Sequence, residues 1–152
     1  MELEIDFAIA GKYGDYHDCY ARNLKIFKRF IKVFDIFFKK QKYENSQVVI
    51  DPDAKNRATI RFCARNYQLG LSLDPAELDR ALVKLEAMGE ERPLELARAT
   101  IVKSESVVFP GEKSVSLQDD YEFNNAVLNF FIRAISKNSV ETAAARKSPA
   151  RK

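Results

Sequence analysis

The sequence predicts a single-domain α+β protein, with a mixed or antiparallel sheet of about five strands and three helices. Two patterns indicate this fold class. Stretches such as 57–65 alternate apolar and polar residues, as half-buried strands do. Stretches such as 15–42 repeat apolar residues every three or four positions, as helices do. With 152 residues, the chain is long enough to bury a core without a disulfide or a metal.

The expected order of elements is strand, helix, two or three strands, helix, two strands, helix. The folded domain is expected to span residues 1–138. It is followed at 139–152 by a basic tail rich in Ala, Lys and Arg, which we expect to be flexible.

The chain opens with a predicted strand and a long helix. Apolar residues alternate with polar or small ones at Leu3, Ile5, Phe7 and Ile9, which is typical of a half-buried strand. Gly11 and Gly14 would then form the turn into a helix from Asp15 to about Lys42. Along one side of that helix, apolar residues recur at spacings of four and three, at Tyr20, Leu24, Phe27, Ile31, Phe34 and Phe38.

The remaining elements follow from alternation and from capping signals. Three strands are expected at 47–50, 57–65 and 67–73, with a turn at 51–56. Asp74, Pro75 and Glu77 form a capping-box pattern that predicts a second helix, ending at Gly89. Its buried stripe would be Leu78, Ala81, Leu82, Leu85 and Met88. Extended segments are expected at 94–102, 106–109 and 114–117, before a last helix that is capped by Asp119 and ends at Lys137.

Charge is distributed unevenly along the chain. The net charge is +3, but the segment from Glu141 onward holds four Lys or Arg and one Glu, a net of +3, so the first 140 residues are neutral. Within them, residues 22–42 carry eight Lys or Arg and a single Asp. The molecule should therefore be polarised, with a basic helix on an acidic body. This layout favours an anionic partner, and it equally favours self-association through opposite patches.

The candidate binding surface is the basic side of the long helix together with the tail. Cations spaced along a helix can follow a line of phosphates or an acidic protein surface. Alternatively, they form the solvated outer side of a packed helix. The candidate residues are Arg22, Lys25, Lys28, Arg29, Lys32, Lys39, Lys40, Arg146, Lys147, Arg151 and Lys152.

Other candidate sites are weaker. Arg57, Arg61 and Arg65 share one side of a predicted strand and could pair with acids of the first strand. Asp51 and Asp53 could hold Mg²⁺, but they also suit a turn. His17 is the one histidine, and together with Cys19 and Cys63 it matches no zinc-site spacing. No phosphate-binding loop or nucleophile elbow is present in the sequence.

These observations favour a non-enzymatic interaction protein that self-associates or docks on a larger protein. One alternative is a nucleic-acid-binding protein that contacts phosphates through the basic helix and tail. A second alternative is a small enzyme with carboxylate or His17 chemistry. We expect no cofactor, metal or membrane partner. With no visible secretory signal and two cysteines expected to be free, we expect a reducing, cytoplasmic location.

Overall fold

The computed structural model describes residues 4, 6–74, 76–77, 79–89 and 91–147, with 138–147 as backbone only. Its elements follow one another along the chain as α1 (Phe7–Gln41), β1 (Gln47–Ile50), β2 (Arg57–Phe62), β3 (Arg65–Leu73), β4 (Arg80–Ala87), β5 (Leu94–Val102), β6 (Ser106–Val108), β7 (Val115–Ser116) and α2 (Asp120–Lys147).

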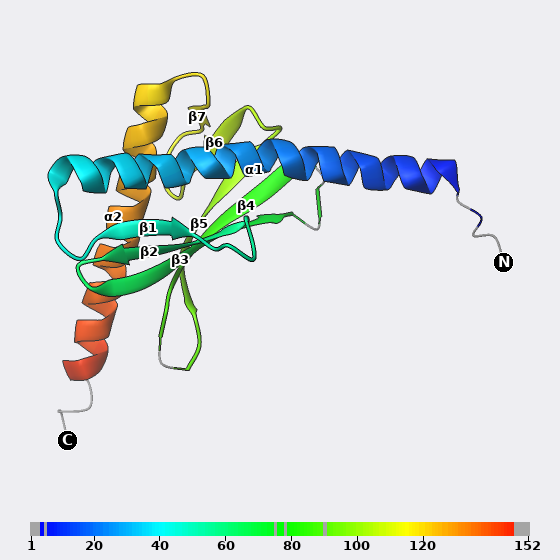
Figure 1. Ribbon diagram of the computed structural model, residues 1–152. Helices are drawn as coiled ribbons and strands as arrows, with labels where there is room; N and C mark the ends of the chain where they lie inside the picture. Colours follow the sequence, from blue (N-terminus) through cyan, green and yellow to red (C-terminus); the bar gives the residue numbers. More distant parts are fainter. Residues whose placement is uncertain (1–3, 5, 75, 78, 90, 148–152) are drawn as a thin grey trace.

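The strands form one seven-stranded antiparallel sheet in which every strand pairs with its neighbours in sequence, in the order β1 to β7. The predicted α+β class with a single sheet is confirmed. The sheet has seven strands rather than about five, and the structure has two helices rather than three. Both helices pack on the same sheet face, and Figure 1 shows α1 crossing the sheet and running beyond it toward the N-terminus.

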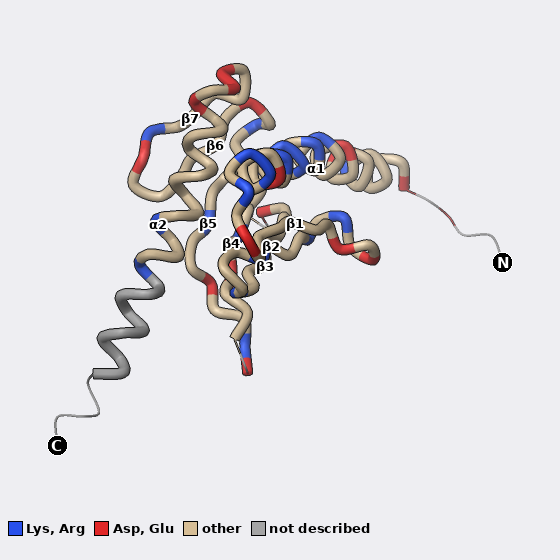
Figure 2. Tube along the Cα trace, turned by 60° about the vertical axis from the view of Figure 1, so that its left-hand side comes forward, with Lys and Arg blue, Asp and Glu red and all other residues tan. Residues whose placement is uncertain are grey.

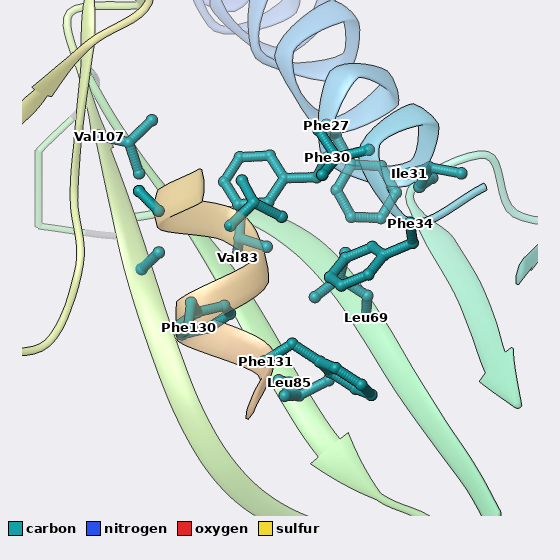
Figure 3. Packing of buried hydrophobic residues seen from close by; sticks show 14 of the residues in the cluster. Phe27, Phe30, Ile31, Phe34, Leu69, Val83, Leu85, Val107, Phe130 and Phe131 are labelled. Carbon is teal, nitrogen blue, oxygen red and sulfur yellow. The ribbon is translucent and has the colours of Figure 1, made fainter. Parts of the chain in front are cut away.

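Phenylalanine rings join the helices to the sheet. Phe131 of α2 lies 5.2 Å from the Phe34 ring of α1, 5.6 Å from Phe62 of β2 and 5.5 Å from Tyr67 of β3, measured between ring centroids. Figure 3 shows these helix residues pointing toward Leu69, Val83 and Leu85 of the central strands. The core is therefore continuous from α1 through the sheet to α2.

The two-sided character predicted for the long helix is confirmed over the part that crosses the sheet. Phe27, Phe30 and Phe34 are completely buried. On the opposite side, Lys25, Lys28 and other cations are exposed. Asn23 is the one buried polar side chain in the described core; it donates to Cys19 Sγ and accepts a hydrogen bond from the Ser104 hydroxyl at 3.1 Å. This contact ties α1 to the turn after β5.

The predicted first strand is wrong where the structure can test it. Phe7 and Ile9 belong to α1, Gly11 and Gly14 lie inside the helix, and Leu3 and Ile5 are outside the described residues. The Asp6 carboxylate accepts hydrogen bonds from the backbone amides of Ala8 and Ile9, which satisfies donors that a helix start leaves free. This N-cap starts the helix well before Asp15.

The predicted second helix is also wrong, because most of it forms strand β4. The segment Arg80–Ala87 alternates as well: Ala81, Val83 and Leu85 are fully buried, whereas the residues between them are not. Strands β3 and β5 flank β4 and use its backbone hydrogen-bonding groups. Asp74 accepts a hydrogen bond from the Ala76 amide, so the expected capping residue closes a turn instead.

The last helix begins as expected but ends later. The Glu122 amide donates to the Asp119 carboxylate at 3.0 Å, as the capping pattern predicts. The predicted core residues Phe123, Val127, Phe130, Phe131 and Ala134 are all buried. The helix then continues to Lys147 instead of ending at Lys137.

Candidate functional site: the exposed surface of helix α1

Most cations of the predicted binding surface lie together on the outer side of α1 (Figure 2). Within the described part of the chain, five of them are exposed and have no ion pair: Arg22, Lys25, Lys28, Lys32 and Lys40. They form a solvent-facing row over about five turns of helix. Their charges are therefore available to an anionic partner.

Two of the predicted cations are held by the protein's own acids. Arg29 forms an ion pair with Asp120 of α2 at 2.9 Å, and its guanidinium lies 4.5 Å from the centre of the Phe123 ring. Lys39 pairs with Asp35 one helical turn away, at 3.0 Å. Arg29 thus joins the two helices, whereas the Lys39 pair is exposed and contributes little to stability.

The tail cations are only partly covered by the structure. The backbone of Arg146 and Lys147 forms part of the last turns of α2. Arg151 and Lys152 lie outside the described residues.

A groove between α1 and α2 runs beside the basic row, with a volume of about 440 Å³. Its floor is apolar, and its rim carries Lys32, Lys40 and the Arg29–Asp120 pair. Ile36 on the floor is 44% exposed, which is high for an aliphatic side chain between two helices. The lining residues are Arg29, Lys32, Val33, Ile36, Phe37, Lys40, Asp120, Asn124 and Leu128.

The N-terminal part of α1 is a second feature of this surface, and the sequence reasoning missed it. Residues 7–18 are all exposed and project past the sheet as a helical overhang about 18 Å long (Figure 1). Phe7 is 88% exposed and Tyr13 is 71% exposed. Eighteen residues make five full helical turns, so Ile9 lies on the same side as the buried Phe27. The sequence therefore contains a signal for this overhang, because the apolar stripe of α1 continues through Tyr16, Tyr13 and Ile9 after the sheet has ended.

The arginines of the second predicted site do not share one side. Cys63 and Ala64 have positive φ angles of 51° and 65° and form the two-residue turn between β2 and β3. Arg65 therefore lies opposite Phe62, on the helix side, whereas Arg57 and Arg61 point to the other side. Acids of a first strand cannot pair with them, because no such strand forms at Phe7–Ile9.

The remaining candidates stay separate. Asp51 accepts a hydrogen bond from the Asp53 amide and pairs with Arg57 at 3.5 Å, so the predicted turn is confirmed there. His17 is exposed on the overhang, 3.7 Å from Asp18. Among the described residues, no group of His, Cys, Asp and Glu is arranged to hold a metal ion.

Cys19 is buried and Cys63 is exposed. A further hollow of about 560 Å³ lies where α1 leaves the sheet and is lined by Asp15, Asp18, Cys19, Arg22, Glu77 and Asp79. Its lining is mainly acidic, in contrast to the basic rim of the groove.

In comparisons with known proteins, the chain matches no family model, no curated protein and no solved structure. A search of the described residues for a helix of the length and apolarity that a bilayer requires finds none. The charges and exposed apolar side chains of α1 are therefore the basis for inferring its function.

Proposed function

We propose that this protein is a non-enzymatic interaction protein that self-associates through the overhang of α1. The observation that supports this most directly is the continuation of the apolar stripe past the sheet. Ile9, Tyr13 and Tyr16 are 52%, 71% and 45% exposed, although they lie on the side of the helix that is buried farther along. Large side chains grouped in this way mark interaction sites more often than solvated surface.

A binding partner would also stabilise the overhang as a helix. The overhang continues a packed helix and needs no new nucleus, but residues beyond the packed part gain only marginal stability from helix propagation in water. This segment contains Gly11 and Gly14, and each glycine disfavours a helix by about 1 kcal/mol relative to alanine. Neither glycine has a neighbouring atom within 4 Å of an added Cβ, so close packing within the chain does not require them. Coverage of the apolar stripe by a second protein would supply the missing stabilisation.

A second copy of the chain is the partner that the charges favour. The start of the chain is acidic, with Glu4 and Asp6 exposed, whereas the later part of α1 carries the exposed Lys32 and Lys40. Each copy thus offers both members of a complementary pair. Opposite patches on one molecule speed its encounter with another copy and orient the two chains.

The test is the mass of the protein in solution, measured by light scattering and by sedimentation over a range of micromolar concentrations. Wild-type chain should show an average mass that rises with concentration. The variant Ile9→Gln/Tyr13→Gln should remain a monomer that still unfolds cooperatively in urea, with any loss of helix content confined to the overhang. Tyr121→Gln, at an 80% exposed tyrosine outside the overhang and the groove, is the matched control and should associate like wild type. A wild-type protein that stays monomeric throughout would refute the proposal.

A second candidate function is nucleic-acid binding, which the exposed row of unpaired cations on α1 favours. Binding would then weaken with salt, at about −0.9 in log K per log salt for each duplex phosphate contacted. Lys25→Glu/Lys28→Glu should abolish retention of DNA or RNA. Both residues lie outside the overhang and do not line the groove, so self-association should survive this change. Retention that is unaffected by the variant, or absent at low salt, would count against this candidate.

A further inference from the structure

The groove between α1 and α2 has the properties of a site for an amphipathic acidic segment. Ile36, Phe37 and Leu128 provide an apolar floor that is only partly covered. Lys32 and Lys40 stand on the rim as exposed cations without an ion pair among the described residues, and the Arg29–Asp120 pair is neutral overall. The groove therefore offers apolar contact below and two uncompensated positive charges above.

The start of this same chain is a segment of the matching kind. Glu2, Leu3, Glu4, Ile5 and Asp6 alternate acidic and apolar residues. In an extended conformation, Leu3 and Ile5 point one way and Glu2 and Glu4 point the other way, while the Asp6 carboxylate caps α1. Such a segment can place its aliphatic side chains on an apolar floor while its carboxylates reach cations at the rim.

We propose that residues 2–6 of a second copy dock in the groove between α1 and α2. The inference rests on the proposed self-association and specifies which two surfaces meet. Phe7 would follow the acidic segment into the contact, which accounts for its 88% exposure. The lengths agree: the groove extends from Arg29 to Lys40, about 16 Å along α1, and an extended segment of five residues spans about 17 Å.

The segment cannot reach the groove of its own chain. Phe7 and Arg29 are separated by continuous helix, which places them about 33 Å apart. Residues 2–6 in full extension span less than about 20 Å. The contact must therefore be intermolecular, and it joins two different surfaces. If two copies exchange their segments reciprocally, this contact gives a closed pair related by a twofold axis; if each copy passes its segment to a different neighbour, it gives a ring or an open chain.

Charge-reversal variants test this pairing in the full-length protein. The donor variant Glu2→Lys/Glu4→Lys and the acceptor variant Lys32→Glu/Lys40→Glu should each self-associate about tenfold more weakly than wild type, or not at all. An equimolar mixture of the two should associate again, because one intact donor meets one intact groove and the two reversed surfaces also complement each other. Lys25→Glu/Lys28→Glu carries the same change of charge outside the groove and should behave like wild type.

A labelled peptide with the sequence of residues 1–8 gives an independent measurement of the same contact. Its fluorescence anisotropy should rise on titration with the donor variant, whose groove is intact, and should not rise with the acceptor variant. The inference fails if the acceptor variant self-associates as strongly as wild type. If the overhang variant Ile9→Gln/Tyr13→Gln is then still monomeric, the proposed function stands and only the groove assignment is wrong. A monomeric wild-type protein that also leaves the peptide unbound would overturn both.

Discussion

Replacement of Phe131 by alanine should destabilise the protein more than most other single changes. The side chain is 2% exposed and contacts rings from α1, β2 and β3, so it links four elements of the fold. Loss of a buried phenylalanine costs about 3–5 kcal/mol. Each well-placed aromatic pair adds about 0.5–1.5 kcal/mol beyond burial, which places this site toward the upper end of that range. A domain of this size has a free energy of unfolding of only about 5–15 kcal/mol.

Urea unfolding followed by circular dichroism measures this loss, and heating should show a melting temperature about 8–20 °C lower. Phe131→Leu should lose much less, since leucine refills most of the volume and only the ring contacts disappear. The neighbouring Ile132→Ala is the control, because Ile132 is 44% exposed. A loss for Phe131→Ala no larger than that of the control would refute the view that these rings hold the helices to the sheet.

Three further predictions concern other parts of the molecule. Asn23→Ala should lower the free energy of unfolding by about 1–3 kcal/mol, and clearly less in a Ser104→Ala background, because the two side chains share a hydrogen bond; a double-mutant cycle measures the difference. Gly14→Ala should slow amide exchange in the overhang, since the added methyl meets no atom and removes about 1 kcal/mol of helix penalty; unchanged exchange would show that the segment is not helical in solution. The hydrogen bonds from Arg98 lower the pKa of the Glu95 carboxyl, so this pair stabilises the fold above the ordinary carboxyl pKa and its contribution is lost as the pH falls through the lowered value. In Arg98→Gln, the pKa of Glu95 measured by NMR should rise, because the hydrogen bonds and the charge that lower it are removed.

The fold class was predictable because the apolar residues of most elements repeat with the periodicity of either a helix or a strand, and not of both. Strands β1 and β5 lie where they were predicted, β2 and β3 differ only in that β2 ends at Phe62 and β3 begins at Arg65, and the core residues of α2 follow the helical spacing. The segment that forms β4 fits both the helical and the strand periodicity of apolar residues. Its Leu, Ala, Lys and Glu residues favour a helix in isolation, and only pairing with β3 and β5 selects the strand. Local sequence does not contain that information.

The candidate site divides in the same way. The cationic row was predictable, since helical spacing alone decides which side of α1 a lysine occupies. Where the sheet ends beneath the helix is decided by the strand lengths, so the exposure of Tyr13 followed only from the three-dimensional arrangement. The groove between α1 and α2 depends on two segments far apart in the chain, which the Arg29–Asp120 contact brings together across 91 positions.

The sequential order of the seven strands has a consequence for how the molecule assembles. Each strand finds its partner a short loop away, so hairpins can add to one another at little cost in loop-closure entropy. The contact between the segments farthest apart in the sequence is the packing of α1 against α2, which takes place over a sheet that has already formed. We therefore expect the meander to fold early and fast, and the docking of α1 onto it to be the slow, final event.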